Sequence, residues 1–269
     1  TLMGGLSGSN LADAAMEAKI LVPEMEEKGY SKEFSSVLTA TSAMITPLIP
    51  PGIGMILYGS IANVSIGKLF VAGIGIGVLL CISLMIMVHF ISKKRGYQPA
   101  TKEKQDPEEV KSAVKQAILP LCLPILIIGG IRIGIVTPTE AGTVAIVYAL
   151  ILGIIYKELK MSDVVDGLKE SVATTASIMM IVGGASAFAW VLTKERIPQQ
   201  LTEVITSSIS NKYVFLIIVI LFLLVVGMFI EGNAAMIVLV PLLAPVAQAY
   251  GINEIHFAML FIFVMAVGG

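Results

Sequence analysis

The chain has 269 residues, of which 56% are hydrophobic and only 14% charged, and its formal net charge is −1. A soluble domain carries about 25% charged residues, and the charged residues here are gathered between apolar runs long enough to cross a bilayer. The composition therefore predicts an all-α, polytopic membrane protein and excludes a nucleic-acid-binding surface. The chain starts at Thr1 without a methionine and stops in an apolar run at Gly269, as expected for part of a longer protein.

The predicted membrane elements are the apolar stretches, which in chain order are 34–62, 66–92, 117–136, 139–156, 172–193, 213–230, 233–250 and 255–269. Residues 93–116 form the predicted cytoplasmic linker, because they contain seven Lys and Arg residues. The polar stretch from Lys194 to Lys212 then falls on the outer side. Its apolar residues recur at helical spacing, which predicts a helix lying along the membrane surface.

Three of the apolar segments contain breaks. The sequence Thr46-Pro47-Leu48-Ile49-Pro50-Pro51-Gly52 interrupts the first span, and only Glu231-Gly232 separates 213–230 from 233–250. Residues 1–22 read as the second arm of a hairpin with a glycine-rich tip. Broken backbone at membrane depth is tolerated where it is buried in protein or lines a cavity, so the breaks predict a shared internal site. Simple packing kinks are the alternative.

From the distribution of Lys and Arg, we expect the first hairpin to open to the cytoplasm and the second to the outside. The sequence therefore predicts two oppositely oriented re-entrant helical hairpins. Each tip is followed by Leu-Val-Pro, at Leu21–Pro23 and Leu239–Pro241, which favours inverted repeats and broken helices of the transporter type. The predicted regions are a first-repeat transport core (1–62), a transmembrane helix (63–92), the linker (93–116), second-repeat scaffold helices with a surface arm (117–170) and a second-repeat transport core with its hairpin (171–269).

A cation site in such a protein needs oxygen ligands from hydroxyls, amides and freed carbonyls. The first tip and the Pro-Pro break supply them from six residues: Ser7, Ser9, Asn10, Thr46, Ile49 and Pro50. No carboxylate is obligatory in this set, which suits sodium better than calcium. Helix capping alone is the alternative role for Ser7 and Ser9.

Four further residues are candidate contacts for an anionic substrate: Asp13, Thr41, Ser42 and Glu231. Asp13 lies three residues past the first tip and Glu231 lies at the second, and ionisable residues near spans are functional candidates by default. A first-turn acid favoured by the helix dipole is the alternative for Asp13. The sequence contains no nucleotide-binding motif and no nucleophile–base or metal cluster, so we expect a protein that is not an enzyme.

These motifs resemble the large membrane subunit of tripartite ATP-independent periplasmic (TRAP) transporters, and the resemblance runs over essentially the whole chain. The segments that carry it are Ser7-Gly8-Ser9 with Ala12-Asp13-Ala14, Leu21-Val22-Pro23-Glu24-Met25, Lys28-Gly29-Tyr30, Thr39-Ala40-Thr41-Ser42 through Pro51, and Thr137-Pro138-Thr139-Glu140-Ala141-Gly142.

The resemblance implies an elevator-type symporter that takes up organic acids with a sodium gradient across the bacterial inner membrane. It implies sodium as the coupling ion, no organic cofactor, and two partners: a small membrane subunit, separate or fused, and a periplasmic substrate-binding protein. The family's first sodium site maps onto the six residues named above. Its second site would use Gly232 and Asn233 together with a Thr-Pro-Pro loop later than Gly269.

The segments Ile61–Gly67 and Ile91–Arg95 are similar to the sialic-acid branch of the family, with C4-dicarboxylates and other sugar acids as rival substrates. Two other functions stay open. A stand-alone sodium/dicarboxylate symporter of related fold would need no soluble partner, and a non-transporting structural subunit or a channel would need no sodium gradient.

Overall fold

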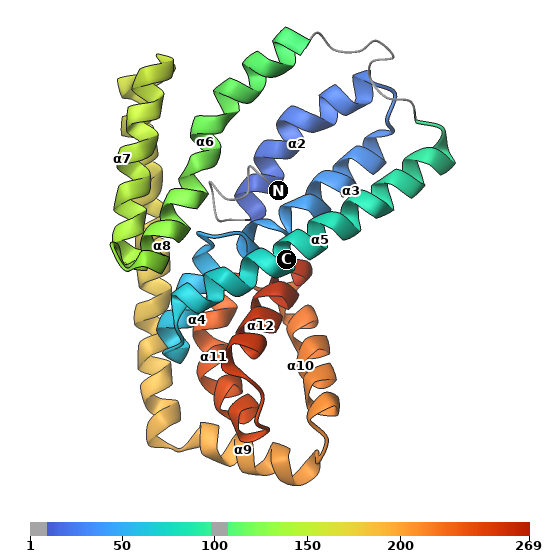
Figure 1. Cartoon of the computed structure of the whole chain (residues 1–269). Helices are drawn as coiled ribbons and strands as arrows, with labels where there is room; N and C mark the ends of the chain where they lie inside the picture. Colours follow the sequence, from blue (N-terminus) through green and yellow to red (C-terminus); the bar gives the residue numbers. More distant parts are fainter. Residues whose placement is uncertain (1–9, 98–106) are drawn as a thin grey trace. The chain divides into compact units, whose positions relative to one another are not determined.

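The computed structural model describes residues 10–97 and 107–269, and every regular element within those two ranges is a helix (Figure 1). The all-helical prediction is confirmed. In chain order the elements are α2 (Asn10–Glu27), α3 (Lys32–Ala43), η1 (Thr46–Leu48), α4 (Ile53–Ala62), α5 (Ile66–Arg95), α6 (Pro107–Ile133), α7 (Pro138–Tyr156), α8 (Met161–Lys194), α9 (Ile197–Ser208), α10 (Lys212–Gly227), α11 (Gly232–Ala249) and α12 (Glu254–Gly268).

The helices are long and apolar enough for a multi-pass membrane protein. Among the described residues, α5, α7, α8 and α11 each have the length and hydropathy to cross a membrane. The pair Lys32–Leu48 and Ile53–Ala62 adds a fifth candidate span if it is counted as one interrupted helix. Shorter apolar helices lie at Ala117–Ile133, Lys212–Gly227 and Glu254–Gly268.

The chain divides into two compact units, and neither is continuous in sequence. Unit 1 comprises Thr1–Gly52 and Phe70–Leu152, and unit 2 comprises Ile53–Leu69 and Gly153–Gly269. The division falls inside the Pro-Pro break, one turn into α5, and near the end of α7. The five predicted regions and the opposite orientation of the two hairpins stay predictions.

Unit 1 contains the predicted break. Helix α2 packs along α3 and η1 (Figure 1). The hydroxyl of Ser31 caps α3 by accepting a hydrogen bond from the Phe34 amide. Helix α3 stops at Ala43, and after the short η1 the backbone is extended at Ile49 and does not become helical again until Ile53. Proline causes this, because Pro47, Pro50 and Pro51 lack an N–H and clash with a continuing helix.

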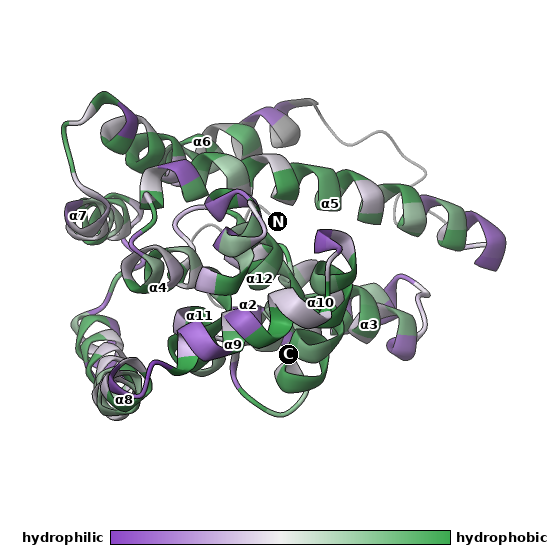
Figure 2. Ribbon diagram, turned by 90° about the horizontal axis from the view of Figure 1, so that it is seen from below, coloured by the Kyte–Doolittle hydropathy of each residue, from purple (hydrophilic) through white to green (hydrophobic). Residues whose placement is uncertain are grey.

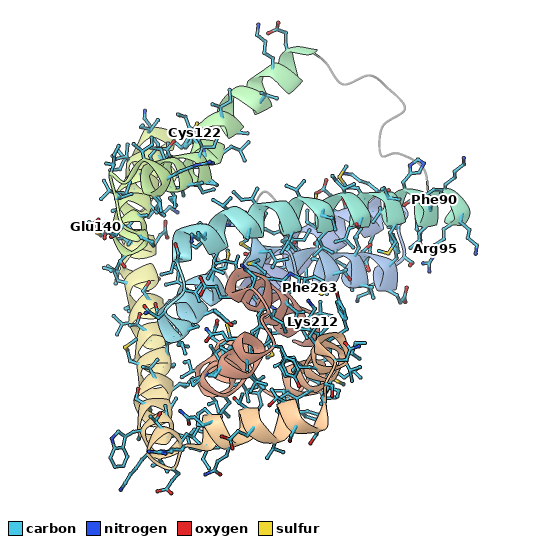
Figure 3. The ribbon with its side chains drawn as sticks, turned by 60° about the horizontal axis from the view of Figure 1, so that its bottom comes forward. Phe90, Arg95, Cys122, Glu140, Lys212 and Phe263 are labelled. Atoms are coloured by element: carbon cyan, nitrogen blue, oxygen red, sulfur yellow. The ribbon has the colours of Figure 1, made fainter. Side chains whose placement is uncertain are left out.

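A capping box begins α7, also in unit 1. The Glu140 carboxylate accepts hydrogen bonds from the Thr137 amide and hydroxyl, and the Thr137 hydroxyl accepts one from the Glu140 amide (Figure 3 labels Glu140). Pro138 occupies the first helical position, where no N–H is needed. Just beyond it, Ala141 packs with Leu123 and Ile127 of α6. The Thr-Pro-Thr-Glu motif is therefore explained by helix initiation.

Unit 2 is built around α11, which packs against α4, α8, α9 and α12. The chain reverses between Gly227 and Gly232, so α10 and α11 run in opposite directions (Figure 1), as the predicted second hairpin requires. Helix α10 packs chiefly on α12. Their backbones come close at Gly227 and Gly268, where a Cβ added to Gly227 would lie 3.0 Å from the Gly268 Cα. A helix is present at the position predicted for the surface helix, as α9, and its place along a membrane surface stays a prediction.

Three helix ends differ from the apolar boundaries. Helix α5 continues to Arg95 and α6 starts at Pro107, so the predicted linker 93–116 is helical at both ends. Helix α8 starts at Met161, well before the predicted residue 172, because Asp163 accepts a hydrogen bond from the Lys160 amide and starts the helix early. Hydrophobicity marks the part of a helix suited to lipid, and charged residues can extend that helix into water.

Candidate functional site

The break after α3 leaves two backbone carbonyl oxygens, those of Ile49 and Pro50, outside any helical hydrogen bonding. Pro50 is buried and Ile49 is partly buried, and within the described residues no backbone N–H donates a hydrogen bond to either carbonyl oxygen. The Thr46 carbonyl, by contrast, accepts a hydrogen bond from the Ile49 amide at 3.2 Å. Carbonyl oxygens without a backbone donor are the kind of group that can bind an ion or a water molecule.

A buried aspartate from α2 faces this break. The Asp13 side chain is 1% exposed, and its Oδ2 accepts a hydrogen bond of 2.7 Å from the hydroxyl of Thr46, which is 2% exposed. The other oxygen, Asp13 Oδ1, is buried and has no hydrogen-bond partner among the described residues. The structure thus brings together two predicted site residues that are 33 positions apart and were assigned to different roles.

A second buried carboxylate lies one turn further along α2. Glu17 is 5% exposed, and its Oε2 accepts a hydrogen bond of 3.3 Å from the Ser42 hydroxyl, which also donates to the Thr39 carbonyl at 2.8 Å. Sequence reasoning did not include Glu17 in the site. The available signal was its spacing of four residues from Asp13, which places both carboxylates on the same face of a helix.

These carboxylates have hydroxyl partners but no basic one. The two ion pairs in the described residues, Lys28–Glu24 and Lys169–Asp166, involve neither Asp13 nor Glu17. A buried carboxylate is costly without a partner charge, and from the described residues each of these two accepts a single side-chain hydrogen bond. The described residues contain no group of three or more His, Cys, Asp and Glu side chains suited to a metal ion. The Asp13 carboxylate, the Thr46 hydroxyl and the Ile49 and Pro50 carbonyls are all oxygen ligands of the kind that hold coupling cations in transporters.

The remaining predicted residues are placed as follows. Asn10 is the first residue of α2, and Ser7 and Ser9 lie outside the described residues. The Thr41 hydroxyl donates to the Val37 carbonyl of its own helix at 2.7 Å.

The second tip, in unit 2, has its own local hydrogen bonds. Glu231 caps α11 by accepting a hydrogen bond of 2.9 Å from the Ala234 amide, and it accepts another of 2.8 Å from the Asn233 side-chain amide. Gly232 is the first residue of that helix. Glu231 is exposed, so capping accounts for its position without a ligand.

Comparison with known proteins gives a match over the whole chain. The model of the family described as "Tripartite ATP-independent periplasmic transporter, DctM component" matches residues 1–269.

Individual relatives agree with that match and differ in their named substrates. The chain is 42% identical to the sialic acid TRAP transporter large permease protein SiaM of Vibrio cholerae, over 99% of this chain and 62% of that protein. It is 36% identical to the sialic acid TRAP transporter permease protein SiaT of Haemophilus influenzae, over 99% of this chain and 43% of that protein. It is 35% identical to the ectoine TRAP transporter large permease protein TeaC of Halomonas elongata, over 100% of this chain and 62% of that protein. The chain spans less than two thirds of the length of these relatives.

Proposed function

Since the chain belongs to the DctM component family of tripartite ATP-independent periplasmic transporters, we propose that it forms part of the large membrane subunit of a sodium-coupled organic-anion symporter. The coupling ion is sodium, and the direction of transport is inward across the bacterial inner membrane. No organic cofactor takes part. The candidate membrane spans and the interrupted helix support this proposal.

The observation that carries the proposal is the contact between Asp13 and Thr46. It places a buried carboxylate at the helix break: Asp13 Oδ2 accepts the Thr46 hydrogen bond, while Oδ1 and the carbonyls of Ile49 and Pro50 have no hydrogen-bond donor among the described residues. A sodium ion held by these oxygens would balance the buried negative charge. The proposed first sodium site therefore consists of Thr46, Ile49 and Pro50 with Ser7, Ser9 and Asn10 of the tip, and Asp13 adds a charge beside them. Gly232 and Asn233 belong to the proposed second site.

Coupling follows from the electrostatics of this site. Without a cation, the Asp13 and Glu17 carboxylates repel each other on one face of α2, and the region around the break is unfavourable for a second anion such as the substrate. With sodium bound, the net negative charge falls and an anionic substrate can approach. Ser42, Thr41 and Glu231 stay candidate substrate contacts, and Ser42 hydrogen-bonds Glu17.

The proposed partners are a small membrane subunit, separate or fused, and a soluble periplasmic protein that delivers the substrate. Sialic acid is the proposed substrate, supported by the named function of two relatives. Because another relative is named for ectoine, the substrate of this chain has to be tested directly.

The test is uptake of labelled sialic acid into proteoliposomes that contain the complete transporter. Uptake is measured with and without an inward sodium gradient, and with and without the soluble binding protein. We expect uptake only when both are present, and labelled ectoine serves as the comparison substrate. Uptake with sodium alone would replace the proposal with a stand-alone symporter. Uptake that is indifferent to sodium would favour a channel and contradict the proposed ion site.

A further inference from the structure

A groove of about 490 Å³ lies in unit 1 between α2, α3 and α5. Its volume is within the range of about 300–1,000 Å³ that small-molecule sites occupy. The lining is almost entirely apolar and includes Leu21 and Met25 of α2, Leu38 of α3, and Leu84, Met85 and Val88 of α5. Helix α5, which forms one side of the groove, is a 30-residue candidate membrane span.

The groove face of α5 continues into a basic end. Ser92 and Lys93 follow Val88 and His89 by four residues each, which places them one turn further along the same face. The Ser92 hydroxyl oxygen is buried and has no hydrogen-bond partner among the described residues. Lys93 and Lys94 are exposed. Figure 2 shows that α5 is hydrophobic along most of its length and hydrophilic at this end.

An aromatic cluster marks the level of this end in the membrane. The Tyr97 ring lies 4.6 Å from that of Tyr30 and 5.5 Å from that of Phe34, measured between centroids. The guanidinium of Arg95, near the end of α5 (Figure 3), lies 5.4 Å from the centre of the Phe34 ring. Tyrosine and arginine side chains gather at the membrane–water interface. This cluster adjoins the apolar groove, since the Tyr30 amide donates a hydrogen bond to the carbonyl of Met25, a groove residue.

We propose that the groove and the basic end of α5 together bind one anionic phospholipid. An acyl chain lies in the groove along Leu84 and Val88, and phosphate oxygens accept hydrogen bonds from the exposed Lys93 ammonium. An apolar body that ends in a basic, aromatic rim matches the amphipathic pattern of such a lipid. Basic clusters next to the cytoplasmic end of a membrane helix attract anionic lipids in this way. A free phosphate ion could occupy the basic end but would not account for the apolar groove beside it.

Native mass spectrometry of the complete transporter in detergent tests this, with phosphatidylglycerol titrated against phosphatidylcholine. We expect one phosphatidylglycerol molecule to be retained in preference to phosphatidylcholine. Val88→Trp fills the groove and should abolish retention, whereas Ile86→Trp should not, because Ile86 is 53% exposed on α5 and does not line the groove. Thermal unfolding in lipid-free detergent verifies that both variants are folded.

A surface variant tests the headgroup contact without altering the packing. The double substitution Lys93→Gln and Lys94→Gln should weaken phosphatidylglycerol retention by about 30-fold, since each basic residue near a membrane surface contributes about fivefold. Lys157→Gln with Lys160→Gln is the matched control and should change nothing. Equal retention of the two lipids, unchanged retention in Val88→Trp, or no retained lipid because another protein segment fills the groove would each overturn the proposal.

Discussion

A Cβ atom added to Gly77 would lie 2.6 Å from Cδ1 and 3.3 Å from Cγ1 of Ile49. The backbone of α5 thus passes directly against the extended residue that follows η1. A Cβ at position 77 would displace the end of the Ile49 side chain, and the Ile49 carbonyl is one of the two oxygens at the break that accept no backbone hydrogen bond from the described residues. Helix α5 is therefore in direct contact with Ile49, one of the proposed sodium ligands, within unit 1.

Gly77→Ala should disturb the break through the side chain of Ile49. The added methyl group displaces the Ile49 side chain, at a cost of about 1 kcal/mol because that side chain can shift. We expect a higher sodium concentration for half-maximal uptake, measured in proteoliposomes. Gly75→Ala is the matched control, since an added Cβ there has no neighbour within 4 Å. Identical sodium dependence in the two variants would mean that the position of Ile49 is irrelevant to ion binding.

Thr46→Val keeps the shape of the side chain and removes the hydroxyl that donates to Asp13. A buried carboxylate then loses its hydrogen bond, which costs about 1–3 kcal/mol of stability. We expect a lower melting temperature and a higher sodium requirement for uptake. Thr193→Val is the control, because that exposed hydroxyl donates only to the Ala189 carbonyl of its own helix. A normal sodium requirement in Thr46→Val, with normal expression, would remove Thr46 from the site.

Glu17→Gln removes one of the two buried charges but keeps an acceptor for the Ser42 hydroxyl. Without sodium, the variant should be more stable than the original protein, because repulsion with Asp13 is relieved. A ligand that binds only the folded protein raises the free energy of unfolding by RT ln(1 + L/Kd), where L is the free ligand concentration, so a weaker-binding ligand gives a smaller increase. The increase in melting temperature on adding sodium should therefore be smaller in Glu17→Gln than in the original protein.

The control for that measurement is Glu26→Gln, an exposed position on the same helix. It should leave the sodium-dependent shift unchanged. The same measurement with potassium separates a specific ion from general salt screening. An equal shift in Glu17→Gln and Glu26→Gln would show that Glu17 takes no part in cation binding.

Gly227→Ala tests the close packing of α10 on α12. The added Cβ would lie 3.0 Å from the Cα of Gly268, and backbone cannot move aside as a side chain can. We expect a loss of about 1–3 kcal/mol in the free energy of unfolding, read from thermal unfolding in detergent. Gly184→Ala, with no neighbour within 4 Å, should be neutral or slightly stabilising. Equal effects of the two substitutions would contradict the observed contact.

The elements that depend on local chemistry could be predicted from the sequence. Proline chemistry located the break between α3 and α4, the short Glu231-Gly232 link located the reversal between α10 and α11, and helical spacing located α9. The family was also identified from local motifs and then confirmed. Helix ends were predicted less well, because Arg95 and Met161 lie in helices that extend beyond their apolar parts.

The side-chain partners could not be predicted in the same way. Asp13 and Thr46 are 33 residues apart, Glu17 and Ser42 are 25 apart, and nothing in the sequence states which face of α2 meets α3. An apolar helix in a membrane protein carries little information about its rotation, because lipid and protein interior are equally apolar. Sequence alone therefore determined the helical class, the breaks and the family, through local backbone chemistry and composition. Only the tertiary structure decided that two carboxylates on one face of α2 are buried and that they pair with Thr46 at the first break and with Ser42 of α3, because burial and pairing depend on how the helices pack.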